Sequence, residues 1–502
     1  RSPAPKMATR RRQSMNKNLM ALAVAGALTA PGLALAQATT SGTNVQIYGL
    51  FDVRFDHMKI SSNTNQAAGS NIGSVSKQHL STGAPNRIGF RGTEALGGGM
   101  QAFFQVETQV FTDARSDNAF GAATNASLGG RPTFLGIRGG WGDLSAGYQE
   151  SVYKDVYQTT WSVNPSNAMF GAIMGNGNTS GQNPTPSCTG LTASGTNNFN
   201  GVSTSAAAAA ASAQVAPVLA SPSASPTAAT SAVRDGVLCS EAMGSTTAFN
   251  RTVSDSISYR SPVFAGFRFS TMLTAKENKE PSTATPAGTS KYESSLGAYS
   301  LTWSGGPFSA AAAYESHVGF RASNAGAALP NRAAKDTGLT LGGRFNYGRG
   351  LIGAGWERLR YANTAVAGAE NNFDLKNWIF QGTFNITASD VLWAGYSKTN
   401  GKTNCGASLI PATAALATAA TAAGTTGCGK ETGAKFMTFG IDHAFSKRTG
   451  VYAYWSKIDN NASANYNYLS DSRQTGAAAG VGSGLATGMD STSYNVGVKH
   501  SF

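Results

Sequence analysis

Residues 45–56 read VQIYGLFDVRFD, and this stretch decides the fold class. Its odd positions carry small or apolar side chains from Val45 to Phe55, and its even positions carry polar ones, with Leu50 as the exception. Alternation of this kind predicts a β-strand with one apolar face and one wet face. A soluble sandwich would bury the apolar face, whereas a large membrane barrel turns it towards lipid and turns the polar face towards water in the lumen.

The composition of the 502-residue chain favours the membrane barrel. Charged residues make up only 13%, glycine contributes 60 residues, and hydrophobic residues make up 41%. Outside the amino terminus, no apolar run reaches the roughly 18 residues expected of a membrane-spanning helix. Low charge and abundant glycine without such a run are typical of a transmembrane β-barrel, whose signal per strand is weak.

Fifteen more segments with strand-like alternation follow residues 45–56. We expect them near 78–94, 100–111, 131–139, 143–149, 251–260, 264–275, 290–303, 308–317, 336–347, 350–361, 372–386, 391–399, 432–445, 449–457 and 490–502. The total of sixteen is even, as closure of a single-chain antiparallel barrel requires. Short and long connections alternate, as periplasmic turns and extracellular loops do. The sequence therefore predicts an all-β, 16-stranded antiparallel transmembrane β-barrel with short periplasmic turns and long extracellular loops.

The last predicted strand ends on an aromatic residue at the carboxyl terminus. Tyr494, Val496, Val498, His500 and Phe502 share one of its faces. Residues at a chain terminus usually fray unless neighbouring structure holds them. Pairing with the first strand would hold this segment and close the barrel.

Residues 1–36 have the organisation of an export signal. Four basic residues precede an apolar core at 19–28, and Ala34-Leu35-Ala36 supplies a small-x-small cleavage pattern. We expect a cleavable signal peptide over 1–36 and a barrel over 37–502. A membrane anchor is the alternative, but the apolar part is short and Pro31-Gly32 interrupts it.

Removal of this leader lowers the formal net charge from +13 to about +7, because the leader holds six basic residues and no acidic ones. The remaining excess is too dilute for a nucleic-acid footprint, which needs basic clusters on one face. We therefore expect no nucleic-acid partner. A modest bias of a pore towards anions is the more natural interpretation.

Residues 150–250 interrupt the series of strands between the fifth and the sixth. They show no sustained strand or helix period. A loop this long inside a compact domain is usually a functional element. In a barrel it can fold into the lumen and narrow it, and we expect it to do so.

The four cysteines form two local pairs. Cys188 and Cys239 lie inside the interruption, and Cys405 and Cys428 flank a second stretch rich in alanine and threonine. In an exported protein such pairs predict disulfides that clip loops. A metal site is the alternative, although no histidine or third cysteine stands at ligand spacing.

Four motifs together resemble one family. They are IYGLFD at 47–52, NRIGFRGTEALGGG at 86–99, DSISYRSP at 255–262 and GVKHSF at 497–502. With them, nearly all of 44–502 resembles a general-diffusion porin of the Gram-negative outer membrane, from the beta-proteobacterial branch.

The resemblance implies a sixteen-stranded barrel in the outer membrane, a homotrimer, and contact with outer-membrane lipid and lipopolysaccharide. It implies passage of small hydrophilic solutes and ions, and no cofactor. The family's third external loop folds inward. By this resemblance, 150–180 forms the constriction with Phe170-Gly171 at its inward bend, and 181–245 is a low-complexity insertion.

Arg87 and Arg91 alternate with Ile88 and Phe90, so the two guanidinium groups face the lumen. They stand roughly 13 Å apart along the strand. An arginine turned towards lipid would cost about 2–4 kcal/mol at the bilayer midplane. These arginines can pair with lumenal carboxylates and hold the loop, or they can set a field that sorts solutes. Both roles can coexist.

The chain departs from the family pattern at two places where the family carries arginine, Tyr148 and Ser258. The basic cluster is therefore reduced, and we expect only a mild anion preference. Alternation also turns Arg138 and Arg344 towards the lumen. The residues predicted for the pore constriction are Arg54, Arg87, Arg91, Arg251, Glu150 and Asp155.

Two other function classes are compatible with a membrane barrel. An outer-membrane hydrolase would need a nucleophile or paired acids, but none of the five histidines lies in a nucleophile motif. A substrate-specific channel or an adhesin could use the Ala/Ser/Pro-rich inserts, which are usually flexible surface segments. Saturating flux for one solute would distinguish a specific channel from general diffusion.

Overall fold

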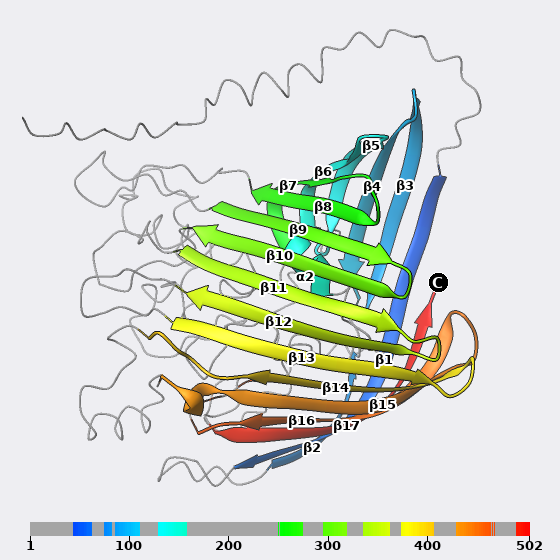
Figure 1. The fold of residues 1–502 in the computed structure, drawn as a ribbon. Helices are drawn as coiled ribbons and strands as arrows, with labels where there is room; N and C mark the ends of the chain where they lie inside the picture. The colour runs from blue at the N-terminus through cyan, green and yellow to red at the C-terminus, as the bar shows by residue number, and fades with distance from the viewer. Residues whose placement is uncertain are drawn as a thin grey trace, which may run out of the picture. The chain divides into compact units, whose positions relative to one another are not determined.

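The computed structural model describes residues 44–62, 75–82, 86–110, 129–157, 249, 252–274, 295–318, 335–361, 373–405, 428–462, 464, 466 and 488–502. These residues belong to one compact unit, Thr43–Phe502. Its strands form a single antiparallel sheet that closes on itself (Figure 1). Among the described residues, no helix combines the length and the apolar character needed to cross a membrane.

The first eight strands come before and directly after the long interruption. They are β1 (Asn44–Ser62), β2 (Val75–Thr82), β3 (Arg87–Gly97), β4 (Met100–Gln109), β5 (Thr133–Gly139), β6 (Gly142–Glu150), β7 (Thr252–Arg260) and β8 (Phe267–Thr274). The remaining strands are β9 (Ser295–Gly305), β10 (Phe308–Val318), β11 (Lys335–Asn346), β12 (Leu351–Tyr361), β13 (Phe373–Asn385), β14 (Asp390–Thr399), β15 (Ala434–Ala444), β16 (Thr449–Asn460) and β17 (Met489–Ser501). Two short helices are described, α2 (Val152–Val156) and the 3-10 helix η4 (Lys430–Thr432).

The predicted sixteen-stranded barrel is confirmed, with one predicted strand split in two. Both β2 and β3 pair with β1, which has 19 residues: β3 along its first part and β2 along its second. They therefore occupy one strand position. The ladder breaks at Asn86, whose side-chain Oδ1 accepts a 2.6 Å hydrogen bond from the amide of Asp52. The register on either side of the break differs by two residues.

The carboxyl-terminal strand closes the barrel, as predicted. β17 pairs with β1 from Leu50↔Ser501 to Ser62↔Met489. Gly49 and Phe502 exchange backbone hydrogen bonds of 3.0 and 3.1 Å. A Cβ at Gly49 would lie 2.2 Å from the ring of Phe502, so only glycine fits beneath the terminal aromatic residue.

Strand ends differ from the prediction by a few residues. The connection between β7 and β8 is an example. The predicted strand began at 264, whereas β8 begins at Phe267. Ala265 and Gly266 both have positive φ, and Phe264 bridges Phe267, so these residues form a tight two-residue turn. Such turns join antiparallel strands without splaying them.

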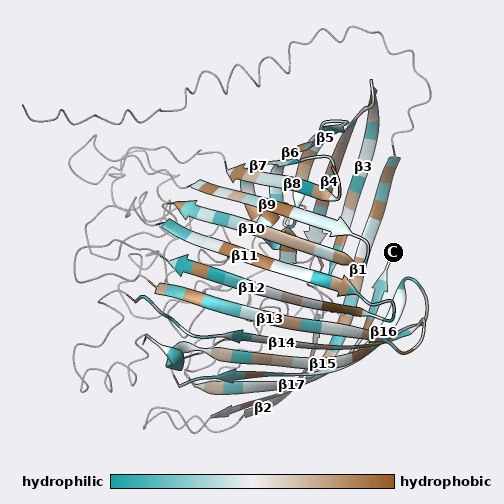
Figure 2. Ribbon diagram, in the orientation of Figure 1, coloured by the Kyte–Doolittle hydropathy of each residue, from teal (hydrophilic) through white to brown (hydrophobic). Residues whose placement is uncertain are grey.

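Hydrophobic and hydrophilic residues alternate along the strands (Figure 2). On β1 the outward residues Val45, Ile47 and Phe55 are about half exposed, whereas Asp52 and Asp56 are buried on the inward face. An exposed apolar face on every side of a closed sheet is what lipid contact requires. His443 and His500 share this outward parity.

Candidate lumenal site

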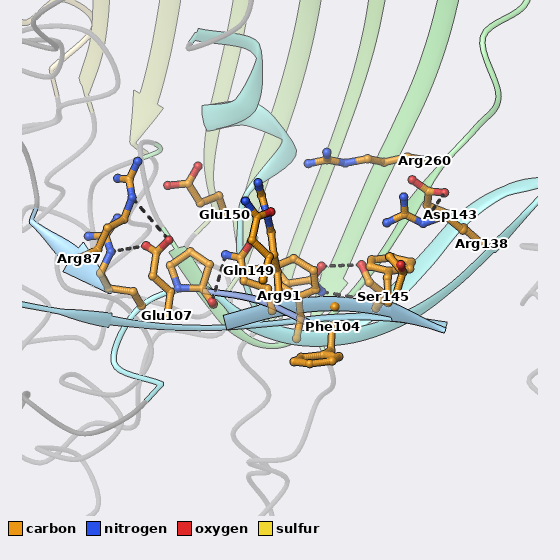
Figure 3. Close-up of a pocket in the computed structure, with 18 of the residues that line it drawn as sticks. Arg87, Arg91, Phe104, Glu107, Arg138, Asp143, Ser145, Gln149, Glu150 and Arg260 are labelled. Carbon is orange, nitrogen blue, oxygen red and sulfur yellow. Dashed lines mark hydrogen bonds and ion pairs between the residues drawn. The ribbon is translucent and has the colours of Figure 1, made fainter. Parts of the chain in front are cut away.

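A cavity of about 990 Å³ lies on the inward face of β1 and β3–β7 (Figure 3). Its basic lining residues are Arg87, Arg91, Arg131, Arg138, Lys154 and Arg260, and its acidic ones are Glu107, Asp143 and Glu150. The excess of positive over negative side chains is three. Short strands with period-two alternation produce this lining, because each second residue of β3, β4, β6 and β7 turns inward.

Glu107 is shared by two arginines. Its Oε1 contacts Nε of Arg131, and its Oε2 lies 3.6 Å from Nε of Arg87. The hydroxyl of Tyr48 donates a 2.9 Å hydrogen bond to the same Oε2. The charge of Arg87 is therefore partly compensated by a buried carboxylate, which is the structural role that the sequence left open for it.

Arg91 lies four residues further along β3, towards the short connections, and its environment is different. Its Nε donates a 2.9 Å hydrogen bond to Oε1 of Gln46, and its guanidinium lies over the ring of Tyr48, 5.0 Å from the centroid. No carboxylate in the described part of the chain pairs with it. Arg91 thus presents an uncompensated positive charge to the cavity.

The end of the cavity near the short connections carries a looser charge pair. Nε of Arg138 lies 3.9 Å from Oδ1 of Asp143, and the Arg138 guanidinium stacks 4.0 Å from the ring centroid of Phe103. Arg260 is the cross-strand partner of Asp143. Figure 3 shows Arg260, Asp143 and Arg138 grouped at one side of the cavity, while the ring of Phe104 points away from it.

The segment that leaves β6 is held against the inward face of the opposite strands. Ser151 caps α2 and also contacts the carboxylate of Glu315 on β10. The hydroxyls of Tyr153 and Tyr157 donate to Oε2 of Glu357 on β12. Burial raises the pKa of both tyrosines well above the usual value, so their hydroxyls remain donors.

The two glutamates receive further support from neighbouring strands. Asn377 on β13 donates a 2.8 Å hydrogen bond to Glu357, and Nε2 of His317 lies 2.5 Å from Glu315. The ring of Phe249, from the other end of the interruption, stacks on His317 with centroids 4.5 Å apart. Both ends of the interruption therefore contact the inward face of β10.

The predicted pore residues are not all brought together. Arg87, Arg91 and Glu150 line the cavity, and Glu150 pairs with Lys154 at 2.7 Å. Arg54 does not line it. Its side chain is 3% exposed and pairs with Asp56 at 2.5 Å.

Several predicted residues lie outside the described part of the chain. Asp155 belongs to α2, but its side chain is not described. The residues wholly outside are Arg251, Phe170, Gly171, Cys188 and Cys239. The other cysteine pair is described: a disulfide joins Cys405 and Cys428, whose Cα atoms are 6.2 Å apart.

Sequence reasoning missed three basic residues of the site. Arg260 shares parity with Ser256 and Ser258, so alternation along β7 could have placed it. Lys154 follows Glu150 by four residues, which is a helical pairing signal. Arg131 precedes β5, and no local signal connects it with Glu107. Among the described residues, no group of three potential metal ligands gathers.

Comparison with known proteins agrees with this geometry. A family model described as Gram-negative porin matches residues 21–463. Major outer membrane protein P.IB of Neisseria meningitidis is 32% identical over 154 residues, which cover 30% of this chain and 38% of that protein. Outer membrane porin protein 32 of Delftia acidovorans is 31% identical over 146 residues, 29% of this chain and 37% of that protein.

The matches to these curated relatives thus span less than two fifths of their length. An anion-selective porin from Comamonas acidovorans shares the fold over 92% of this chain and 100% of its own, with a TM-score of 0.53 and 16% identity. The family match extends over most of the chain, and it includes the motif at 86–99 that carries Arg87 and Arg91. The chain belongs to the Gram-negative porin family, whose members are β-barrels of the outer membrane.

Proposed function

We propose that this barrel forms a water-filled channel for passive diffusion of small hydrophilic solutes and ions, with a mild preference for anions. The single observation that carries the preference is Arg91, a lumenal guanidinium without a carboxylate partner among the described residues. The proposed activity needs no bound cofactor and no catalytic group, since transport follows the solute gradient.

The charge pairing in the cavity explains why the preference is mild. Glu107 is shared by Arg87 and Arg131, and Glu150 is paired with Lys154. The three carboxylates of the lining thus offset half of its six basic groups and leave an excess of three positive charges, so the field is weaker than six unpaired cations would give. A unit charge at 4 Å in water contributes about 1 kcal/mol, which corresponds to about fivefold enrichment of the favoured ion.

The narrowing element is proposed to be the third long loop. The contacts of Tyr153 and Tyr157 with Glu357 support this assignment, because they carry the chain after β6 onto the inward face of the far wall. By family resemblance, residues 150–180 would then narrow the lumen, with Phe170-Gly171 at the inward bend, and 181–245 would be an added insertion. The homotrimer also rests on the resemblance.

The test is reversal potential in planar bilayers under a potassium chloride gradient. We expect a potential that indicates chloride permeating more readily than potassium. Single-channel conductance should rise linearly with salt, as expected for a water-filled pore without a tight binding site. A reversal potential of the opposite sign would refute the anion preference, and the absence of conductance would refute the channel.

A further inference from the structure

Four arginines lie on the inward face of the wall from β5 to β11, beside its short connections (Figure 1). Each stands within three residues of the connection next to its strand. Their inward direction follows from parity, since the alternating residues Ile137, Phe269 and Phe345 are exposed on the outward face. We call these four residues the exit arginines: Arg138, Arg260, Arg268 and Arg344.

The sheet register brings the exit arginines to neighbouring levels of this wall. Asp143 is the cross-strand partner of Arg138 on one side and of Arg260 on the other. Arg268 is two residues from the partner of Arg260 on β8, a diagonal position about 7–8 Å away. Arg344 follows three strands further on, roughly 14 Å across the sheet at about 4.8 Å per strand. The four charges therefore share one region of the lumen.

Carboxylates compensate little of this charge. In the described part of β5–β12, Asp143 is the one acidic side chain within three residues of a short connection. Its Oδ1 lies 3.9 Å from Nε of Arg138, and that Nε is buried without a hydrogen-bond partner among the described residues. Within the described ranges, no carboxylate pairs with Arg268 or Arg344. Four guanidinium groups thus stand against one carboxylate.

The opposite wall of the lumen has a different charge balance near the same end. Asp442 on β15 and Lys499 on β17 pair with each other at 2.5 Å. Nε1 of Trp393 donates a 2.8 Å hydrogen bond to the same carboxylate. Positive charge is therefore compensated there, and its excess lies on the wall from β5 to β11.

Small side chains leave room between Arg268 and Arg344. At the level of Arg268, the register places Thr302 on β9, Ala311 on β10 and Gly342 on β11. The other two exit arginines line the lumenal cavity of about 990 Å³ (Figure 3). Long basic side chains thus rise above a floor of short ones, and a solute has space between the guanidinium groups.

We propose that the exit arginines bind small polyanions, which are solutes that carry two or more phosphate or carboxylate groups. The inference rests on the proposed function, because it places the site inside a conducting lumen. The short connections of such a barrel are periplasmic, so the site lies at the periplasmic end.

The chemistry of guanidinium groups suits this class of solute. Arginine keeps its charge at every physiological pH and binds phosphate or carboxylate oxygens through paired N–H donors. A solute with two anionic groups can contact two exit arginines at once, whereas a chloride ion cannot bridge them. The site therefore retains polyanions at the periplasmic end, and their flux saturates while that of chloride does not.

The experiment measures the block of potassium chloride current through single channels in planar bilayers at pH 7. The probes are inorganic diphosphate, which presents phosphate groups, and citrate, which presents carboxylates. R268Q/R344Q removes the two exit arginines that have no carboxylate partner among the described residues. K376Q/K398Q is the matched control, because it removes two positive charges from the outward face of β13 and β14.

We expect both probes to reduce the current through the unmodified channel. R268Q/R344Q should raise their half-blocking concentrations at least about tenfold, because two charges at contact distance are lost. K376Q/K398Q should stay within about twofold of the unmodified channel, since outward charges do not meet the solute. If R268Q/R344Q yields no open channels, R268Q alone tests the site, with an expected rise of about threefold.

R87Q/R91Q distinguishes the exit arginines from the arginines of β3, which lie elsewhere in the lumen. It should shift the half-blocking concentrations less than R268Q/R344Q does. Block by diphosphate alone would support the site with phosphates as its ligands, and block by citrate alone would support it with carboxylates.

Four results would overturn the proposal: no block of the unmodified channel, no shift in R268Q/R344Q or R268Q, an equal shift in K376Q/K398Q, or an equal or larger shift in R87Q/R91Q. The last result would place the polyanion beside β3. Conductance in potassium chloride alone separates the two ideas. Open channels without polyanion block refute only the site at the exit arginines, whereas absence of conductance in the unmodified chain refutes the channel.

Discussion

The guanidinium of Arg91 lies over the ring of Tyr48, 5.0 Å from its centroid, while the hydroxyl of that tyrosine is bonded to Glu107. The side chain of Tyr48 therefore contacts both a cation that has no carboxylate partner among the described residues and the carboxylate shared by Arg87 and Arg131. The ring positions Arg91 without neutralising it, because a cation–π contact leaves the net charge in place. We therefore expect ion selectivity to depend on which lumenal arginines are paired with a carboxylate.

Replacing Arg91 should reduce anion preference more than replacing Arg87. Arg91→Gln removes an uncompensated charge, whereas Arg87→Gln removes one that already shares Glu107. We expect the chloride-to-potassium permeability ratio to fall by about two- to fivefold in Arg91→Gln and by less in Arg87→Gln. Reversal potentials of the two variants at equal salt provide the measurement. A larger effect for Arg87→Gln would show that the pairing does not govern selectivity.

Removing Glu107 should have the opposite effect. Glu107→Gln leaves Arg87 and Arg131 without their shared carboxylate, so anion preference should rise by about two- to fivefold. Asp143→Asn serves as a control, because it also removes one acid of the cavity but its pair with Arg138 is looser, at 3.9 Å. Equal shifts in both variants would indicate that only total charge matters.

The barrel could be predicted from the sequence because the alternation of apolar and polar residues depends only on neighbouring positions in the chain. Alternation along 45–56 determines the face of each side chain, and the count and spacing of such segments predict closure. The split of 78–94 into β2 and β3 could not be predicted this way. It depends on Asn86 accepting from the amide of Asp52, a contact between residues 34 apart.

The candidate site was predictable only in part, because the charge pairs in it join residues that are far apart in the sequence. Arg87 and Arg91 could be assigned to the lumen by parity, but parity cannot show that Glu107 compensates one and not the other. Arg54 has the right parity and still lies outside the cavity lining, where it is buried and pairs with Asp56, two residues along the same strand. Whether a lumenal arginine has a carboxylate partner depends on the side chains that the neighbouring strands place beside it.

Replacing Glu357 should loosen the segment after β6. Glu357→Gln weakens the acceptor of two tyrosine hydroxyls and of Asn377 in a buried site, which should cost about 1–3 kcal/mol. Hydrogen exchange of residues 151–157 should then speed up, while exchange in β12 itself stays slow. Unchanged exchange in α2 would mean that these contacts do not anchor it. Lys376→Gln, which lies outward on β13, is the matched surface control.

Adding a methyl group at the barrel seam should destabilise closure. Gly49→Ala places a carbon 2.2 Å from the ring of Phe502, whereas Gly382→Ala meets nothing closer than 3.5 Å. Overpacking of this kind costs about 1–3 kcal/mol. The temperature at which the folded band disappears in semi-native electrophoresis should drop for Gly49→Ala and stay within a few degrees for Gly382→Ala. Similar temperatures for both would show that the seam relaxes around the added group.

The connection between β14 and β15 should make stability depend on pH through Lys402. Burial lowers the pKa of this lysine from 10.5 to about 7, and its ammonium lies 4.9 Å from the ring centroid of Phe373. Between these two values the unfolded chain binds a proton that the folded chain does not. The free energy of unfolding should therefore rise with pH across this window, by up to about 1.4 kcal/mol per unit.

Below pH 7 both states are protonated, so the full penalty for the buried charge is present and the slope vanishes. Lys402→Met removes the titrating group, whereas Lys430→Met removes an exposed lysine near the same disulfide. Urea unfolding at pH 6, 8 and 10 gives the measurement. The difference in unfolding free energy between the unmodified chain and Lys402→Met should grow with pH in favour of the unmodified chain, and Lys430→Met should show no such trend. A difference that stays constant from pH 6 to 10 would show that Lys402 keeps its charge in the fold, held by solvent that reaches its ammonium group.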